Sequence, residues 1–345
     1  MVAPPLHFFD APKLTPLSSP RAARCDTTDC VMAERTKLKR EELVGPWAGL
    51  PVAWSVDDEF DEAIYRVDVA RCCAAGVPGV CMGGTTGEFY ALEFEEFRAV
   101  IRATIQECRA HDKPAMIGCT ATHTRAVVRR VEAAVKLGAS AIMVALPFWL
   151  EVGDDGVVPF FKEVGAAAVG LPIIYEETLR AKKLLTVRQH QEIKDAVPDY
   201  AAVYAAADTV GTTPAGCQTL ARFVNVLVHE ELWSALGPKG AVGSCSLMVC
   251  WNPRLVLGLW RSLQNKDWVA LGIARARIRS LLKFLEMEFG TKGFTDAAYA
   301  RMGALATGFL QTSLRNRAPY RSATEGDVEL LRQWCARGYP ELLEL

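Results

Sequence analysis

The sequence predicts an α/β protein folded as one (β/α)₈ barrel of the TIM-barrel type, followed by a C-terminal helical extension. From about residue 48 onward, short apolar runs alternate with amphipathic stretches of helical period, which is typical of repeated β-α units around a parallel sheet. Eight such runs occur, the number that closes a barrel. The chain has 345 residues, half of them hydrophobic, so it can bury a large core.

The strands and helices follow in regular order along the chain. The eight expected strands are 48–54, 78–84, 114–120, 141–147, 171–177, 200–206, 223–229 and 240–246. Polar residues mark the helix starts between them: Asp57 and Asp58 begin the first helix, and Thr122 is placed to cap the third. Glycines at positions 76, 138 and 170 end helices just before strands.

Two segments flank the barrel, which we expect to span residues 46–265. Residues 1–45 are rich in Pro, Ser, Thr and charge and show no sustained period, so they predict a flexible tail. Cys25 and Cys30 lie in this polar segment, where a disulfide or a metal is an alternative to free thiols. Residues 266–345 are helical in pattern and predict an extension that packs on the barrel's side and serves packing or assembly.

Composition excludes several classes of partner. The chain carries 39 basic and 40 acidic residues, a formal charge of −1, so it has no strong field to attract nucleic acid or an anionic membrane. No apolar run approaches the roughly 20 residues that span a bilayer, and the N-terminus lacks the pattern of a secretion signal. We therefore expect a cytoplasmic protein with a small-molecule partner. Most of the 11 cysteines sit in apolar patterns and predict buried thiols.

The reacting groups of such barrels come from the C-terminal ends of the strands and the loops that follow. After the second strand, Gly83–Glu88 (GGTTGE) combines glycines, which allow backbone N–H groups to approach a ligand, with two hydroxyls. This loop predicts a carboxylate receptor, with an ordinary tight turn as the alternative. The fifth strand ends in Tyr175, Glu176 and Glu177, and Arg180, Lys182 and Lys183 follow. Taken singly, Tyr175 could equally be a core residue, and the charged cluster a solvated loop.

Four motifs together resemble one family. GTTGE at 84–88, ALPFW at 145–149, IIY at 173–175 and GAVGS at 240–244 make the chain similar to the dihydrodipicolinate synthase and N-acetylneuraminate lyase family from about residue 46 to at least 260. The resemblance implies a (β/α)₈ lyase or aldolase that acts on pyruvate or another 2-oxo acid through a lysine Schiff base. It also implies a homo-oligomer, a dimer or a tetramer.

The same resemblance implies roles for individual residues. Thr85 and Thr86, with Gly84, would hold the carboxylate of the 2-oxo acid. Tyr175 would be the phenol that transfers protons. Arg180 would sit where dihydrodipicolinate synthases bind the carboxylate of a second substrate.

The chain departs from the family pattern at the Schiff-base lysine. The family carries that lysine on strand six in a G-[IV]-K-[ED] pattern, and here Tyr204 stands in its place. Lys194 copies the motif superficially but lies in the helical stretch before Pro198, outside the expected barrel. A phenol cannot condense with a ketone to give an iminium, so the family's usual mechanism should fail. Trp149 also replaces the family's relay tyrosine, and Glu176 replaces the asparagine that usually follows the strand-five tyrosine.

These observations predict a lyase-type enzyme (aldolase, dehydratase or cyclisation chemistry) that acts on a 2-oxo acid or similar small carboxylate by noncovalent acid–base catalysis, an effect worth ~10²–10⁴-fold. We expect no cofactor and no metal. The predicted catalytic residues are Tyr175, Tyr204 and Glu176. The predicted substrate-binding residues are Gly84, Thr85, Thr86, Arg180 and His229.

Two other functions fit the same residues. A catalytically inactive relative that binds a small carboxylate or a protein partner would explain the loss of both the lysine and the relay tyrosine. A metal-assisted aldolase or hydrolase would use His123, Glu176 and His229 from three strand ends, although three scattered residues are more often satisfied separately than joined at one ion.

Overall fold

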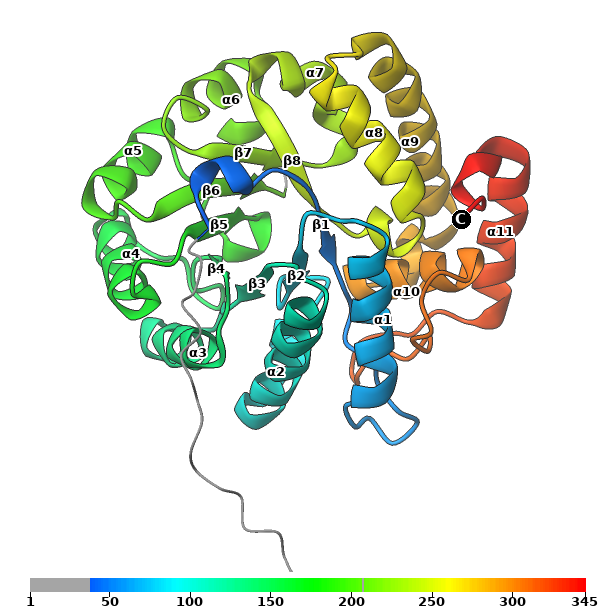
Figure 1. Ribbon diagram of the computed structural model, residues 1–345, viewed down its shortest axis with the longest axis horizontal. Coiled ribbons are helices and arrows are strands. Elements are labelled where there is room, and N and C mark those ends of the chain that lie inside the picture. The colour runs from blue at the N-terminus through cyan, green and yellow to red at the C-terminus, as the bar shows by residue number, and fades with distance from the viewer. Residues whose placement is uncertain (1–37, 207) are drawn as a thin grey trace, which may run out of the picture. The chain divides into compact units, whose positions relative to one another are not determined.

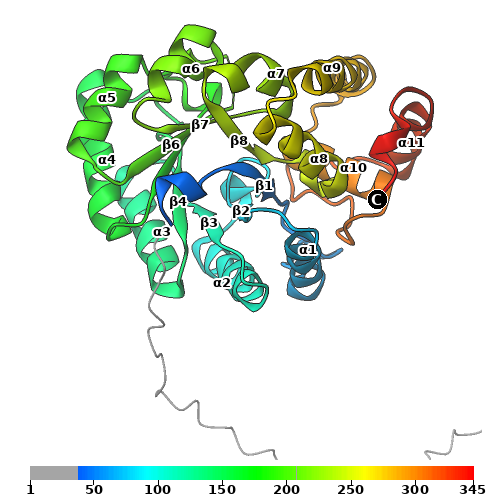
Figure 2. The same cartoon turned by 45° about the horizontal axis from the view of Figure 1, so that its top comes forward.

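The computed structural model describes residues 38–206 and 208–345, and within them the predicted fold is confirmed (Figure 1). Eight parallel strands, β1 to β8, pair in chain order and close into a barrel, with β8 hydrogen-bonded to β1. Helices between the strands surround the barrel (Figure 2). Cys25, Cys30 and most of the predicted tail lie outside the described residues.

Seven of the eight predicted strands contain the observed one, and the first is displaced. The strands are β1 (Gly45–Gly49), β2 (Val80–Met82), β3 (Ala115–Gly118), β4 (Ala141–Val144), β5 (Ile173–Glu177), β6 (Tyr200–Ala205), β7 (Asn225–Val228) and β8 (Ala241–Ser246). We predicted 48–54 for the first. Leu50, Val52 and Trp54 are buried as expected, but they belong to the loop after β1. An apolar run indicates that its residues are buried, but it does not show that they form a strand. Here tertiary contacts bury a loop.

The barrel helices are α1 (Glu62–Ala74), α2 (Phe94–Ala110), α3 (Thr124–Leu137), α4 (Asp154–Ala168), α5 (Val187–Ala196), α6 (Pro214–Leu220), α7 (Trp233–Leu236) and α8 (Pro253–Gln264). Two helix starts differ from prediction. Asp61, not Asp57 or Asp58, caps α1 by accepting a hydrogen bond from the N–H of Ile64. His123, not Thr122, caps α3.

Short 3₁₀ helices complete the loops: η1 (Arg40–Glu42), η2 (Phe89–Ala91), η3 (Leu179–Ala181), η4 (Val210–Thr212), η5 (Glu230–Leu232), η6 (Gly237–Lys239), η7 (Met248–Cys250), η8 (Gly290–Lys292) and η9 (Pro340–Leu342). The first lies inside the segment predicted as a tail. Its Arg40 donates to Asn225 Oδ1 at 2.9 Å, and the neighbouring Leu43 is fully buried. Residues 38–45 therefore belong to the folded unit, at the N-terminal end of the barrel.

The barrel has an inner and an outer apolar core. Inside the strands lies a small cluster that includes Trp47, Met143, Ile174 and Ala202. A larger cluster fills the space between the strands and the surrounding helices. Because side chains alternate along a strand, one strand can contribute to both cores, as β5 does with Ile174 in the inner one and Tyr175 in the outer one.

The C-terminal extension consists of α9 (Trp268–Phe289), α10 (Asp296–Thr307) and α11 (Glu325–Gly338), confirming the predicted helical pattern (Figures 1 and 2). α9 packs along α7 and α8, and α10 packs against α11. Asp68 of α1 ties the extension to the barrel by accepting hydrogen bonds from the N–H groups of Gln311 (2.7 Å) and Thr312 (3.0 Å). None of the helices in residues 38–206 and 208–345 has the length and apolar character needed to cross a membrane.

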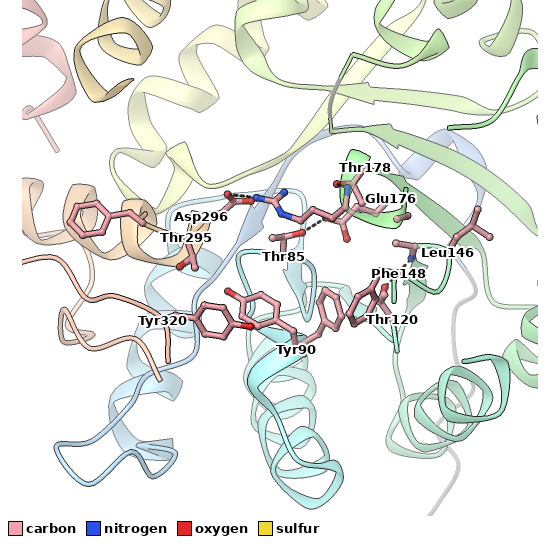
Figure 3. Close-up of a pocket in the computed structure, with 15 residues that line it drawn as sticks. Thr85, Tyr90, Thr120, Leu146, Phe148, Glu176, Thr178, Thr295, Asp296 and Tyr320 are labelled. Carbon is pink, nitrogen blue, oxygen red and sulfur yellow. Dashed lines mark hydrogen bonds and ion pairs between the residues drawn. The ribbon is translucent and has the colours of Figure 1, made fainter. Parts of the chain in front are cut away.

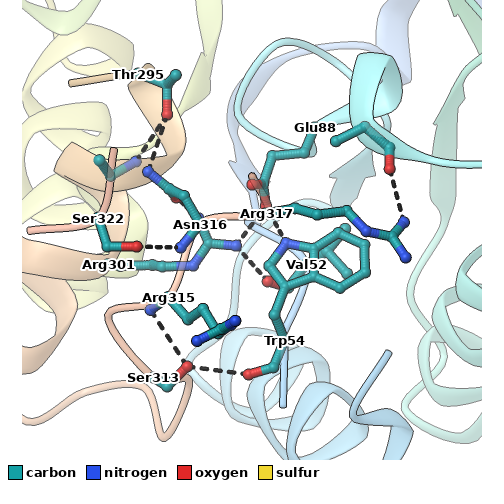
Figure 4. Close-up of polar contacts among 12 residues, drawn as sticks. Val52, Trp54, Glu88, Thr295, Arg301, Ser313, Arg315, Asn316, Arg317 and Ser322 are labelled. Carbon is teal, nitrogen blue, oxygen red and sulfur yellow. Dashed lines mark hydrogen bonds and ion pairs between the residues drawn. The ribbon is translucent and has the colours of Figure 1, made fainter. Parts of the chain in front are cut away.

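A buried ion pair joins the extension to the loop after β2 (Figure 4). Arg301 of α10 and Glu88 are both almost fully buried and form an ion pair through Glu88 Oε2. The same carboxylate oxygen accepts a hydrogen bond from Trp54 Nε1 at 3.2 Å. Arg301 also donates to Val52 O and Asn316 Oδ1. This ion pair therefore anchors the GGTTGE loop to α10.

Candidate active site

A cavity of about 300 Å³ opens at the C-terminal ends of the strands, where barrels of this type carry their active sites (Figure 3). Strand ends contribute Thr85, Thr120 and Glu176. The extension contributes residues on the opposite side, among them Asp296 and Tyr320. The cavity therefore lies between the barrel mouth and the C-terminal extension.

Glu176 is the β5 side chain that faces this cavity. Thr85 Oγ1 donates a hydrogen bond to Glu176 Oε1 at 2.9 Å, and Glu176 as a whole is only 4 % exposed. Burial raises the pKa of Glu176 above its usual range, although hydrogen bonds from Thr85 oppose this effect. A buried carboxyl with a raised pKa is the kind of group that serves as a general acid or base near neutral pH.

Tyr204 lies beside Glu176 on the next strand. The two residues are register partners of β5 and β6, so their side chains point to the same face, the barrel interior. Tyr204 is half-buried there and packs near Cys245. Burial, followed by the neighbouring Cys245 and Glu230, raises its pKa well above its ordinary value. Tyr204 is not among the residues that line the cavity.

The structure corrects the placement predicted for Tyr175. Because side chains alternate along β5, Tyr175 points away from the barrel interior and into the outer core. Its ring contacts Phe161 of α4 at 5.4 Å and His190 of α5 at 6.0 Å between ring centroids. The residue is fully buried and does not line the cavity. Of the two neighbouring residues that we predicted to be catalytic, only Glu176 reaches the cavity.

Arg180 supplies a positive charge at the cavity mouth. It is the one arginine or lysine among the lining residues in the described part of the chain. Its guanidinium forms an ion pair with Asp296 of α10 at 3.0 Å, and both side chains are partly exposed (Figure 3). The predicted anion-binding role of Arg180 therefore requires that a ligand displace Asp296.

The other predicted binding residues lie at varying distances from the cavity. Gly84 is buried beside the Glu176 carboxylate. Thr86 is half-buried and does not line the cavity. His229 accepts a hydrogen bond from the N–H of Glu231 at 3.4 Å and lines a second cavity, which Asp296 also borders. The structure thus separates His229 and Thr86 from the site around Glu176.

The histidines predicted for the metal-assisted alternative act as helix caps. His123 Nδ1 accepts from the N–H of Ala126 at 3.4 Å, as His229 does for η5. Within residues 38–206 and 208–345, no three His, Cys, Asp or Glu side chains are grouped to hold a metal ion. The structure does not bring His123, Glu176 and His229 together.

The lysines near the mouth are engaged elsewhere. Lys182 donates to the backbone oxygen of Trp149, and Lys183 pairs with the carboxylate of Asp154. Lys194 donates to backbone oxygens near the start of β6, at the opposite end of the barrel. Among the residues that the structure describes, the lining of the cavity includes no amine.

Sequence reasoning missed the part of the site that comes from the extension. Phe294, Asp296 and Tyr320 all line the cavity. Tyr320 packs edge-on against Tyr90 at 4.8 Å between ring centroids, which closes one side of the mouth (Figure 3). These residues lie in a segment of helical pattern with no recognisable motif, so only the packing of the extension reveals them.

Comparison with known proteins decides the family. The model of the "Dihydrodipicolinate synthetase family" matches residues 47–315. The chain belongs to this family. The match confirms the predicted resemblance and covers nearly all of the barrel and the extension through Asp296, but it ends before Tyr320.

Relatives of known sequence in the family carry several activities in their names. A probable 5-dehydro-4-deoxyglucarate dehydratase of Streptomyces coelicolor is 27 % identical over 311 residues, 85 % of this chain and 92 % of the relative. A 4-hydroxy-tetrahydrodipicolinate synthase of Nitrobacter hamburgensis is 27 % identical over 70 % of this chain and 79 % of the relative. A trans-o-hydroxybenzylidenepyruvate hydratase-aldolase of Pseudomonas putida is 30 % identical, but over only 38 % of this chain and 42 % of the relative.

Solved structures of the family share the fold. YagE of Escherichia coli K12, a member of the dihydrodipicolinic acid synthase family in complex with pyruvate, superposes with a TM-score of 0.77 at 17 % identity. The superposition covers 86 % of this chain and 98 % of YagE. At this identity the likeness shows the fold alone. The relatives in this family are named as a dehydratase, a synthase and a hydratase-aldolase, and membership of the family identifies the chain as a lyase-type enzyme.

Proposed function

We propose that the protein is a lyase that acts on a small carboxylate, such as a 2-oxo acid, by noncovalent acid–base catalysis, with Glu176 as the catalytic group. The observation that carries this proposal is the buried Glu176 carboxylate, held by Thr85 at the inner wall of a cavity whose described lining contains no lysine. The related dehydratase, synthase and hydratase-aldolase support the reaction class.

Arg180 would bind the carboxylate of the substrate. Its partner Asp296 is partly exposed, and exposed ion pairs are worth little, so an incoming carboxylate can replace it at small cost. The guanidinium offers paired N–H donors that match a carboxylate. With the carboxylate at the mouth, the rest of the substrate extends inward toward Glu176.

Glu176 would then move the proton. In its ionised form it removes a proton from the carbon next to the substrate's carbonyl group. In its protonated form it delivers the proton to a departing hydroxyl group, which leaves as water. Burial raises the pKa of Glu176, which favours its protonated form relative to an exposed glutamate, and the bond from Thr85 holds the carboxyl in one orientation.

Tyr204, which does not line the cavity, would support this step through Glu176, its register partner on the neighbouring strand. Its raised pKa keeps the phenol protonated at neutral pH, so it acts as an acid or a hydrogen-bond donor inside the barrel. We give Tyr175 no role at the reacting atoms, because it lies in the outer core.

The walls of the cavity favour a substrate with an apolar or aromatic part. Phe89, Tyr90, Phe148 and Tyr320 line it, and Phe89 packs edge-on against Phe148 at 5.7 Å between ring centroids. Such walls bind a flat apolar group through contact area and edge-to-face packing. The Pseudomonas putida hydratase-aldolase is named for an aromatic compound, trans-o-hydroxybenzylidenepyruvate.

Two measurements test the proposal. Wild type and Glu176→Gln are assayed against a panel of 2-oxo acids and hydroxy acids with aliphatic and aryl ends. We expect Glu176→Gln to lower kcat by ~10²–10⁴-fold, because it removes the acid–base group. Glu151→Gln, the same change at an exposed loop position, should leave kcat unchanged. Absence of turnover on the whole panel would support an inactive carboxylate-binding relative instead.

The second measurement addresses the mechanism. Borohydride added with pyruvate should leave the protein unlabelled, since no cavity-lining residue in the described chain carries an amine. Mass spectrometry that finds a reduced adduct on Lys182 or Lys183 would contradict noncovalent catalysis.

A further inference from the structure

The loop after β2 already holds a carboxylate, and that carboxylate belongs to the protein. Thr85 Oγ1 donates to Glu176 Oε1 at 2.9 Å (Figure 3), and the backbone N–H of Thr85 also favours the ionised carboxyl by lowering its pKa. The carboxyl also lies close to Gly84, because a Cβ placed there would be 3.6 Å from Oε2 and 3.8 Å from Oε1. The donors that would suit a ligand carboxylate are thus occupied from within.

We propose that Glu176 determines specificity by occupying the donors of Thr85, so that this end of the cavity accepts a ligand group that is neutral and donates a hydrogen bond, and rejects a carboxylate. The inference rests on the proposed function for the identity of the site, but it concerns binding and does not require turnover. It assigns the substrate an orientation, with its carboxylate at Arg180 and a hydroxyl, amide or similar donor at Glu176.

Glu176 is not easily displaced from Thr85. It lies within β5, and the residue is only 4 % exposed. Removing its hydroxyl donor would leave a buried carboxylate without that bond, which is costly. A ligand carboxylate would therefore have to compete for Thr85 against a group that the barrel wall holds in place.

Among the described residues, no unpaired cation lies near Thr85 to compensate a second negative charge. Two carboxylates a few ångströms apart repel each other strongly in a buried site. Arg180, the one cation in the described lining, is already paired with Asp296. Arg301 behind the loop is paired with Glu88. A ligand carboxylate beside Glu176 would thus be unbalanced.

The two ends of the cavity differ in how easily a ligand can displace the protein's own carboxylate, Asp296 at the mouth and Glu176 at the inner wall. At the mouth, the Arg180 and Asp296 side chains are 60 % and 35 % exposed, so water can solvate either group when the pair opens. At the inner wall, Glu176 and Thr85 are both buried. This difference directs a ligand carboxylate to the mouth and leaves Glu176 as an acceptor for the other end of the ligand.

Propionate and propionamide test the inference, because they have the same size and differ in charge and in N–H donors. Their affinities are measured by ligand-observed NMR at one neutral pH for wild type, Glu176→Ala, and Glu176→Ala with Thr85→Val. In wild type we expect the Thr85 end of the cavity to prefer propionamide, whereas Arg180 can bind propionate at the mouth. In Glu176→Ala the preference at the Thr85 end should invert, with the overall affinity ratio changing at least tenfold in favour of propionate, because Thr85 is released.

The double variant tests whether the change in Glu176→Ala comes from the freed hydroxyl of Thr85 or only from the space that the smaller side chain leaves. Thr85→Val keeps the side-chain shape and removes the hydroxyl donor, so it should abolish most of the inversion. Glu176→Gln is a second, shape-preserving test: its neutral amide still fills the Thr85 site, so the ratio should fall between those of wild type and Glu176→Ala. An unchanged ratio in Glu176→Ala and Glu176→Gln, or an inversion that survives Thr85→Val in full, would overturn the inference. Loss of turnover in every assay would defeat the proposed function and leave these ratios as they are.

Discussion

Replacing Arg301 by methionine should destabilise the protein severely. The guanidinium is fully buried and donates to Glu88, to the backbone oxygen of Val52 and to Asn316. Its removal leaves a buried carboxylate whose remaining donor is Trp54 Nε1. Removing one partner of a buried ion pair typically costs about 3–5 kcal/mol, which is a large part of a domain's stability.

Urea unfolding followed by circular dichroism measures the effect. Arg301→Met should lower the free energy of unfolding by about 3–5 kcal/mol. Adding Glu88→Gln should recover part of this loss, because no buried charge then remains. The control is Arg98→Met, which breaks the exposed pair with Glu95 and should cost at most about 0.5 kcal/mol. A loss in Arg301→Met as small as that in Arg98→Met would refute the reasoning that the pair holds α10 to the barrel.

Three further predictions follow from single residues. Burial raises the pKa of Asp68 from 3.8 to about 6, so its stabilising contribution is full below pH 3.8 and is lost as the pH rises through 6. Relative to Asp68→Asn, wild type should lose up to about 3 kcal/mol in urea unfolding between about pH 3 and about pH 7, and a gain would contradict this. Arg180→Met should raise KM at least tenfold with little change in kcat. Asp296→Asn, which frees the Arg180 guanidinium from its ion pair, should lower KM. If steady-state kinetics show no change in KM for Arg180→Met, Arg180 does not bind the substrate. Gly83→Ala should lower the free energy of unfolding by about 2 kcal/mol or more, measured by thermal unfolding, because the φ of Gly83 is +85° and a Cβ there would lie 2.5 Å from a backbone oxygen of β3. The control is Gly272→Ala on α9, where a Cβ meets no atom within 4 Å, and it should cause no loss of stability.

The repeating units of the barrel were predictable because each is encoded locally. Seven apolar runs contain the observed strands, since a parallel strand buried on both faces needs continuous apolar residues. The first strand was displaced because Leu50, Val52 and Trp54 are apolar for another reason, contact with residues far along the chain. Apolar character records that a residue is buried and not which partner buries it.

The candidate site was predictable in part. Its motif after β2 and the polar end of β5 named Thr85, Glu176 and Arg180, all of which line the cavity. The choice between Tyr175 and Glu176 depended on which residue of β5 faces inward, and a shift of one residue reverses that choice. The pairing of β5 with β6 decides it by placing Glu176 opposite Tyr204.

By itself, the sequence determined the barrel, its family and the kinds of group at the strand ends, because these depend on residue types at short spacing. Only the tertiary structure decided that Glu176 takes up the donors of Thr85, and that Asp296 and Tyr320 of the extension close the cavity. These contacts join residues that are at least 91 positions apart in the sequence. They also depend on the direction in which each strand points its side chains. No local pattern carries that information, because it exists only once the chain has closed on itself.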